Sequence, residues 1–251
     1  MLYLKYERDD YMKLLEKAKI VLTDITKQLT MIFLYFIIPS LFNSIPIFKK
    51  NLNESSELYN LAYFTIYIVI ITLFISLYRK RIIPDFYDFL KKFKKYIKDN
   101  WHYYVIGLSL MILLNAIIGL FLGLPENEIA IRTVFKNSPF TYTLIIIIFG
   151  PIIEEIMTRA PLKNTFNCKI IYYILSALVF GLLHVIDYID TNNLLGLFHI
   201  LPYATLGFSF AIIYDKSNNI WTNIFFHSLH NTITILLLVI AGGLLWKNFY
   251  L

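Results

Sequence analysis

The sequence predicts an all-α protein, a polytopic transmembrane helical bundle of about seven to eight spans. Its 251 residues are 58% hydrophobic and 17% aromatic, which is too apolar for an ordinary soluble domain. Seven apolar runs are each near or above the roughly 17–25 residues that a helix needs to cross a bilayer. They cover residues 30–48, 58–78, 103–124, 140–158, 170–187, 194–214 and 220–246. One such run could be a buried core helix, but seven in one chain exclude that interpretation.

Two basic segments have the pattern of helices that lie on a membrane surface. Residues 1–29 and the loop 79–101 each carry apolar residues at helical spacing among charged ones. Basic amphipathic helices favour anionic headgroups, and this accounts for the net charge of +6. We therefore expect the lipid bilayer as a partner and no nucleic acid, because basic residues commonly border membrane spans.

The distribution of Lys and Arg predicts the orientation. The segments on the N-terminal side of the predicted spans hold eighteen of these residues and those on the other side hold five. The positive-inside rule then places the N-terminus in the cytosol of a multi-pass protein, which we expect in the cell membrane of a microbe. The last run is about 40 Å long as one helix, so we expect it to tilt, or to break near Asn231 or Gly242-Gly243. The side of the C-terminus stays open.

The domain organisation follows from these patterns. Residues 1–29 form an interfacial helix, and residues 30–251 form one transmembrane domain whose chemically equipped helices lie in 140–235. The first three spans carry no ionisable side chain in their interiors. Cys168 is the only cysteine, which excludes an internal disulfide and a thiolate metal cluster.

The stretch "GPIIEEIMTR" places three ionisable residues where a membrane helix continues. Such groups cost about 2.5–3.5 kcal/mol each at membrane depth. Glu155 and Arg159 are at i and i+4, the favourable order for an ion pair within a helix. Glu154 points about 100° away and has no such partner, which suits a general base in a low-dielectric setting. The alternative is that both acids sit at a water-exposed helix end.

Histidine residues in the following spans complete a constellation. Glu154 and His184 are equally distant from the turn near 169, so an antiparallel pair of helices places them at one depth. His227 and Asn231 share a helix face at i and i+4, and Asn231 offers amide donors to an oxyanion. His227 could donate there too or bind a metal, or the two could bridge helices as a polar pair. We expect a structural role for His199.

Three motifs together resemble a known family. Glu154-Glu155-x-x-x-Arg159, Phe180-x-x-x-His184 and His227-x-x-x-Asn231 are similar, in order, to the motifs of the CAAX-processing and bacteriocin-processing (CPBP, or Abi) intramembrane proteases, which include the type II CAAX prenyl endopeptidases. The resemblance covers about residues 140–235. It implies a peptidase with an active site inside the membrane that opens to the cytosolic side.

The resemblance also implies roles for the matching residues. Glu154 and His184 activate a water, and His227 and Asn231 stabilise the tetrahedral oxyanion. Glu155 and Arg159 are supporting residues. The cofactor is none or Zn²⁺: Glu154, His184 and His227 would form a two-His, one-carboxylate zinc set, but the sequence lacks HExxH, and we favour the metal-free reaction.

The predicted function is therefore an intramembrane endopeptidase of CAAX prenyl endopeptidase type, acting on a lipidated or membrane-associated protein or peptide. A non-catalytic membrane partner, such as a bacteriocin self-immunity protein on the same fold, is the alternative. A transporter or proton relay is a third reading, since intramembrane Glu and His are typical of both, but the sequence shows no inverted repeat. The sequence indicates neither the substrate nor the oligomeric state.

Overall fold

The computed structural model describes residues 2–45, 57–137, 139–166, 168–190 and 193–249, and every regular element within these ranges is a helix. In chain order the helices are α1 (Leu2–Ser44), α3 (Glu57–Leu122), α4 (Glu126–Asn137), α5 (Pro139–Leu144), η1 (Ile145–Phe149), α6 (Gly150–Thr158), α7 (Ala160–Thr165), α8 (Lys169–Leu183), α9 (Asp187–Asp190), η2 (Leu194–His199), α10 (Ile200–Ser217) and α11 (Ile220–Phe249). Residues 46–48, the end of the first predicted run, lie outside the described residues. The predicted all-α class is confirmed.

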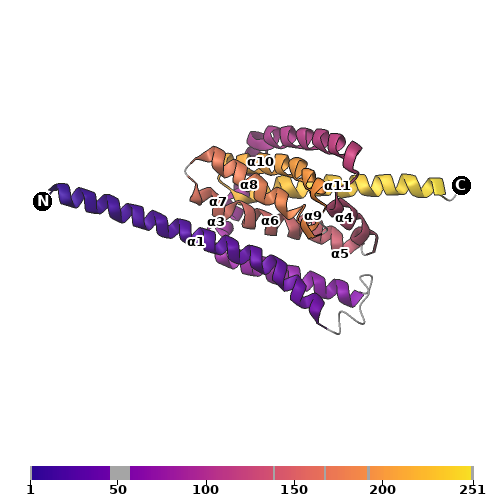
Figure 1. The fold of residues 1–251 in the computed structure, drawn as a ribbon, viewed down its shortest axis with the longest axis horizontal. Coiled ribbons are helices and arrows are strands. Elements are labelled where there is room, and N and C mark those ends of the chain that lie inside the picture. Colours follow the sequence, from indigo (N-terminus) through magenta and orange to yellow (C-terminus); the bar gives the residue numbers. More distant parts are fainter. Residues whose placement is uncertain (1, 46–56, 138, 167, 191–192, 250–251) are drawn as a thin grey trace.

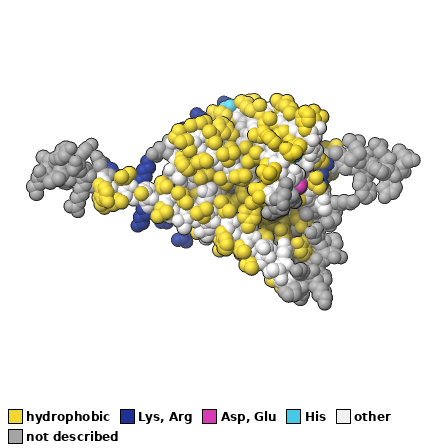
Figure 2. All heavy atoms as spheres, in the orientation of Figure 1, with side chains coloured by type: hydrophobic (Ala, Val, Ile, Leu, Met, Phe, Trp, Pro, Cys, Tyr) yellow, Lys and Arg dark blue, Asp and Glu magenta, His cyan; other side chains and the backbone are white. Residues whose placement is uncertain are grey.

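Five helical stretches are long and apolar enough to cross a membrane. They are Tyr11–Ser44, Tyr59–Leu122, Pro139–Lys163, Leu194–Ser217 and Ile220–Ile240. The second holds two of the predicted runs, and α8 is a shorter apolar helix of 15 residues. The described parts of the seven runs are thus helical, apart from residue 45, residues 123–124 and the run 170–187, which leaves its helix after Leu183. Figure 2 shows the consequence for the surface, since hydrophobic side chains cover most of the visible face.

The two long terminal helices differ in detail from the prediction. α1 continues without a break from the basic N-terminal segment into the first apolar run. α11 is one continuous helix of 30 residues, so the break expected near Asn231 or Gly242-Gly243 is wrong. In Figure 1 the chain ends of α1 and α11 project from opposite sides of a compact central bundle.

α3 turns twice and returns through the bundle. Its backbone is non-helical at Tyr78, where the first apolar part ends, and at Lys92, inside the basic segment 79–101. The predicted helix in that segment is therefore present but is interrupted by a kink at Lys92. Its side chains bind the turn between α10 and α11, because Arg81 Nη2 donates to Asn218 Oδ1 at 2.9 Å and Asp85 Oδ2 accepts from the Ile220 amide at 3.1 Å.

The bundle has two chemically different ends. The basic end gathers segment 79–101, the turn from α7 to α8 and the turn from α10 to α11, where Lys163 Nζ also donates to Asn218 Oδ1 at 2.9 Å. The α4 end lies beyond the other end of α8, where α4 contacts α9 and the Glu126 amide donates to Tyr188 Oη at 2.8 Å. Figure 1 shows α7 and α4 on opposite sides of the central bundle.

The C-terminal helices form the core that holds the site. α10 packs against α3 and α8, and α11 packs against α3, α6 and α10. The α3–α10 approach is close because Gly107 has no side chain there: a Cβ at Gly107 would lie 2.1 Å from Ser209 Oγ. α1 and the first part of α3 run side by side and cover α6 from another side (Figure 1).

Candidate active site

A π-helical turn shapes the helix that carries the two glutamates. In η1 the Gly150 amide bonds to the Ile145 carbonyl, five residues back, instead of to Ile146. The same pattern would bring the amide of residue 151 to the Ile146 carbonyl, but residue 151 is a proline and has no N–H. The Ile146 carbonyl is satisfied instead by Asn231, whose Nδ2 donates to it at 2.8 Å. Because residue 151 is a proline, Asn231 of α11 is hydrogen-bonded to this turn.

Glu155 and Arg159 form the predicted ion pair. Arg159 Nε lies 3.2 Å from Glu155 Oε2, and both side chains are fully buried. The guanidinium also lies over the rings of Phe180, at 4.6 Å, and Phe210, at 5.8 Å. A buried charge needs a partner and hydrogen bonds to be tolerated. Glu155 is the partner, and the Nη1 and Nη2 atoms of Arg159 donate to Thr158 Oγ1 and to the Gly207 carbonyl oxygen.

Glu155 is held from the other side by α11. Its Oε2 accepts from Asn223 Nδ2, and its Oε1 lies 2.9 Å from His227 Nδ1. Since Glu155 is paired with Arg159 it is a carboxylate, so His227 Nδ1 carries the proton and donates it. The Nε2 atom of His227 then faces Glu154 with its lone pair, 3.8 Å from Glu154 Oε2.

His184 reaches the same carboxylate from the end of α8. The helix stops at Leu183, where the His184 amide bonds to Gly181 and leaves the Phe180 carbonyl without its regular partner. His184 Nδ1 lies 2.9 Å from that carbonyl and must be the donor, because a carbonyl oxygen only accepts. His184 Nε2 is thereby directed to Glu154 Oε2, at 3.7 Å. His184 is therefore not deep within a longer helix, as the run 170–187 suggested, but at a helix end.

Glu154 is the unpaired member of the cluster. Its Oε2 atom is buried and has no hydrogen-bond partner among the described residues, although two imidazole nitrogens face it. Buried polar atoms are nearly always hydrogen-bonded to protein or ordered water. At 3.7–3.8 Å both ring nitrogens are too far from this oxygen for a direct hydrogen bond, so its partner has to come from the cavity.

These side chains line a cavity of about 380 Å³. Glu154, His184, His227 and Asn231 all reach it, as does His230. α4 contributes Asn127, Glu128 and Ile131, so the cavity extends to the α4 end of the bundle. Ile112 and Leu237 also line it and are 59% and 60% exposed, which places one margin of the cavity at the apolar outer surface.

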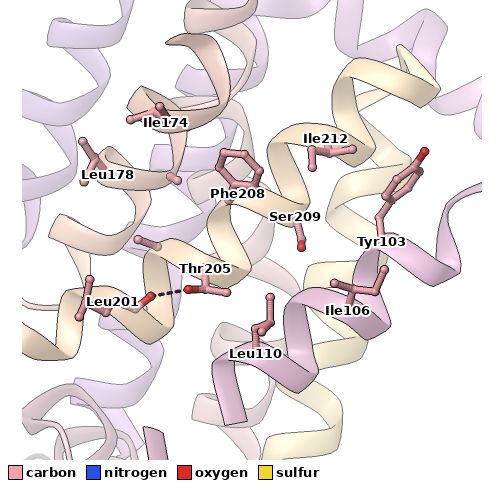
Figure 3. A pocket seen from close by; sticks show the side chains of 12 residues that line it. Tyr103, Ile106, Leu110, Ile174, Leu178, Leu201, Thr205, Phe208, Ser209 and Ile212 are labelled. Atoms are coloured by element: carbon pink, nitrogen blue, oxygen red, sulfur yellow. Dashed lines mark hydrogen bonds between the residues drawn. The ribbon is translucent and has the colours of Figure 1, made fainter. Parts of the chain in front are cut away.

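A larger hollow of about 530 Å³ lies elsewhere, between α3, α8 and α10 (Figure 3). Among the described residues, no carboxylate, histidine or cationic side chain lines it. The Thr205 hydroxyl, one of its few polar groups, donates to the Leu201 carbonyl at 2.8 Å. Size alone does not mark a site, and we assign the chemistry to the smaller cavity.

The sequence analysis missed several residues that build the site. Asn223 has a usable signal, because Asn223, His227 and Asn231 follow one another at intervals of four and share one helix face. Tyr203 stacks on the His184 ring at 4.6 Å between centroids and lines the cavity, with no signal of its own. Tyr35, Tyr67 and Asn115 line the cavity from the N-terminal half, outside the range 140–235 in which we expected the chemically equipped helices.

His199 and Cys168 lie apart from these groups. His199 is buried and stacks on Tyr188 at 5.8 Å, with neither ring nitrogen hydrogen-bonded among the described residues. Cys168 is exposed at the start of α8, at the basic end. Neither lines the cavity.

The donor types around Glu154 are those that zinc takes in proteins, and each imidazole is oriented through its other nitrogen, as metal-bound histidines are. Among the residues that the structure describes, no group of three or more His, Cys, Asp or Glu side chains is spaced to hold a metal ion. The choice between no cofactor and Zn²⁺ therefore belongs to the proposal below, whose steps use no metal.

The fold and this cluster define the class: an α-helical membrane protein with a carboxylate between two imidazoles in an intramembrane cavity. The comparisons with known proteins agree with that class. Residues 136–233 match the family model described as "Type II CAAX prenyl endopeptidase Rce1-like". This segment contains all three motifs, and the resemblance predicted from them is confirmed.

Two curated relatives are similar over longer stretches. The "Putative membrane peptidase YdiL" of Bacillus subtilis (strain 168) is 28% identical over 152 residues, which are 59% of this chain and 52% of that protein. An "Uncharacterized protein" of Mycoplasma capricolum subsp. capricolum is 24% identical over 221 residues, 78% of this chain and 61% of that one. This chain thus spans about half to three fifths of the length of these relatives. No solved structure matches significantly.

Proposed function

We propose that this protein is an intramembrane endopeptidase that hydrolyses a peptide bond of a lipidated, CAAX-type or membrane-associated substrate. The observation that carries the proposal is the buried Oε2 atom of Glu154, which lies without a hydrogen bond between two imidazole nitrogens in a cavity. The family match to type II CAAX prenyl endopeptidases supports the same reaction class.

The proposed reaction uses a water bound between Glu154 and His184. His184 Nε2 accepts one hydrogen bond from the water and orients it, while Glu154 takes the other proton as the oxygen attacks the carbonyl carbon. Asn231 retains a second amide N–H, beyond the one that binds Ile146, and donates it to the oxyanion. Glu154 then returns its proton to the leaving amine as the C–N bond breaks.

His227 has a different role in the proposed reaction from those of Glu154, His184 and Asn231. With its Nδ1 proton on Glu155, it presents a lone pair to the cavity, so an oxyanion role would require a second proton on the ring. In the proposed reaction it accepts a hydrogen bond from Glu154 once Glu154 has taken the proton of the water. The Glu155–Arg159 pair and Asn223 hold its ring in place.

The test is cleavage of a farnesylated CAAX peptide by the purified protein, alongside Glu154→Ala and with a zinc chelator. Cleavage by the wild type and not by the variant supports the proposal, and chelator sensitivity would choose Zn²⁺ as cofactor over none. A wild type that binds but never cleaves membrane peptides would favour the non-catalytic partner instead. The proposal includes a location in the cell membrane with the N-terminus in the cytosol. Labelling of Cys168 and of Ala130→Cys tests this orientation.

A further inference from the structure

Few hydrogen-bond donors to an oxyanion are left among the catalytic side chains of the cavity. An oxyanion is best stabilised by preorganised donors aimed at the developing charge. His227 uses its Nδ1 proton on Glu155, and Asn231 uses one amide N–H on the Ile146 carbonyl. His184 uses its Nδ1 proton on Phe180. With both imidazoles protonated at Nδ1, His184, His227 and Asn231 together leave a single N–H, that of Asn231, to donate to the oxyanion.

Two tyrosines line the cavity from helices outside the segment 140–235. Tyr35 lies on α1 and Tyr67 on α3, and both line the cavity that holds Glu154. Both are half-buried. Within the part of the chain that the structure describes, neither hydroxyl makes a hydrogen bond. A phenolic O–H that faces a membrane cavity needs a partner, and it is a good donor to an oxygen anion.

The rings are placed by packing rather than by the hydroxyls. Both rings pack against the core cluster that includes Ile153 of α6 and Met31 of α1. The ring of Tyr67 also lies 5.7 Å from that of Tyr63, which stacks on Tyr59 at 5.6 Å. Such packing holds each O–H in place without consuming it, which is the arrangement a catalytic donor requires.

We propose that the hydroxyls of Tyr35 and Tyr67 are further catalytic groups, which donate hydrogen bonds to the scissile carbonyl oxygen as it becomes an oxyanion. This inference rests on the proposed function. It gives the N-terminal half a chemical role, since α1 and α3 would complete a site whose other groups lie between residues 140 and 235.

The test compares Tyr35→Phe, Tyr67→Phe and the double variant with Tyr63→Phe. Tyr63 is the matched control, because it belongs to the same aromatic cluster but does not line the cavity. With a farnesylated CAAX peptide we expect each cavity variant to lower kcat about 10-fold, and the double variant about 100-fold, below the 10²–10³ of the best oxyanion donors. KM and the thermal unfolding temperature should stay within error, and Tyr63→Phe should keep full kcat. Unchanged kcat in the double variant, or an equal loss in Tyr63→Phe, overturns the inference.

A second readout separates this inference from the proposed function. The same peptide with its scissile amide replaced by a phosphinate carries a tetrahedral anion and needs no turnover. We expect the double variant to bind this analogue about 100-fold more weakly than the wild type, and to bind the uncleaved peptide equally well. Equal binding of the analogue by both proteins would overturn the inference even if Glu154→Ala shows that the enzyme is a protease. If the wild type neither cleaves the peptide nor binds the analogue, both proposals fail.

Discussion

His227 Nδ1 lies 2.9 Å from Glu155 Oε1, while Nε2 of the same ring lies 3.8 Å from Glu154 Oε2. The His227 ring thus donates a hydrogen bond to Glu155 and directs the lone pair of its other nitrogen towards Glu154. The two carboxylates differ in their other contacts: Glu155 has Arg159 and Asn223, and Glu154 has no hydrogen bond to Oε2 among the described residues. Substitution of Glu154 should therefore lower activity, and substitution of Glu155 should lower stability.

For Glu154→Gln we expect the loss of peptidase activity with an unchanged fold. General base catalysis contributes typically 10²–10⁴-fold to a rate, and the amide cannot take the proton of water. The variant should unfold at the wild-type temperature in detergent, since the replaced oxygen has no hydrogen bond to lose among the described residues. Full activity of this variant would show that the base has been assigned to the wrong residue.

For Glu155→Gln we expect a loss of stability. The change leaves the fully buried Arg159 without its counter-ion, and breaking a buried pair in this way costs about 3–5 kcal/mol. Thermal unfolding of the two variants in the same detergent measures the difference. A Glu155→Gln protein as stable as Glu154→Gln would contradict the supporting role that we assign to the ion pair.

The three motifs predicted the meeting of Glu154 with His184 because hydrophobic periodicity and a short turn fix the depth of residues in a helical hairpin. The ion pair of Glu155 with Arg159 was predictable for the same reason, since i and i+4 are neighbours on any helix. The cavity contacts of Tyr35 and Tyr67 were not, because they depend on how α1 and α3 rotate against α6. No local pattern sets that rotation. The helix end at His184 was also missed, since apolar residues continue beyond it.

Pro151→Ala tests how the π-helical turn acts on the site. The new amide of residue 151 can donate to the Ile146 carbonyl, which then no longer needs Asn231. We expect kcat to fall about 10-fold, because Asn231 loses the contact that positions it, and we expect no loss of stability, because alanine favours a helix. Pro161→Ala is the control, since Pro161 lies in the first turn of α7, where its missing N–H costs nothing. Equal activity of the two variants would show that the turn does not position Asn231.

Gly207→Ala should disturb the support beneath both imidazoles. A Cβ at Gly207 would lie 2.9 Å from Phe180 Cδ1, and the Phe180 ring contacts His184 at 4.6 Å and His227 at 5.4 Å. Overpacking of this kind costs about 1–3 kcal/mol. We expect lower stability together with lower kcat. Gly119→Ala is the matched control, because nothing lies within 4 Å of its Cβ, and it should stabilise α3 by about 0.5–1 kcal/mol. Measurements of unfolding and turnover on both variants check this pair.

The single native cysteine allows the orientation of the site to be measured. Cys168 is exposed at the basic end, and Ala130 is exposed on α4, whose neighbouring residues Asn127 and Glu128 line the cavity. The excess of Lys and Arg predicts that the basic end lies in the cytosol. In intact cells we therefore expect a membrane-impermeant maleimide to spare Cys168 and to label Ala130→Cys in a Cys168→Ser background. That outcome would put the α4 end of the cavity outside the cytosol, against the cytosolic opening implied by the resemblance. Labelling of Cys168 alone would reverse the orientation predicted from charge and restore a cytosolic opening at α4.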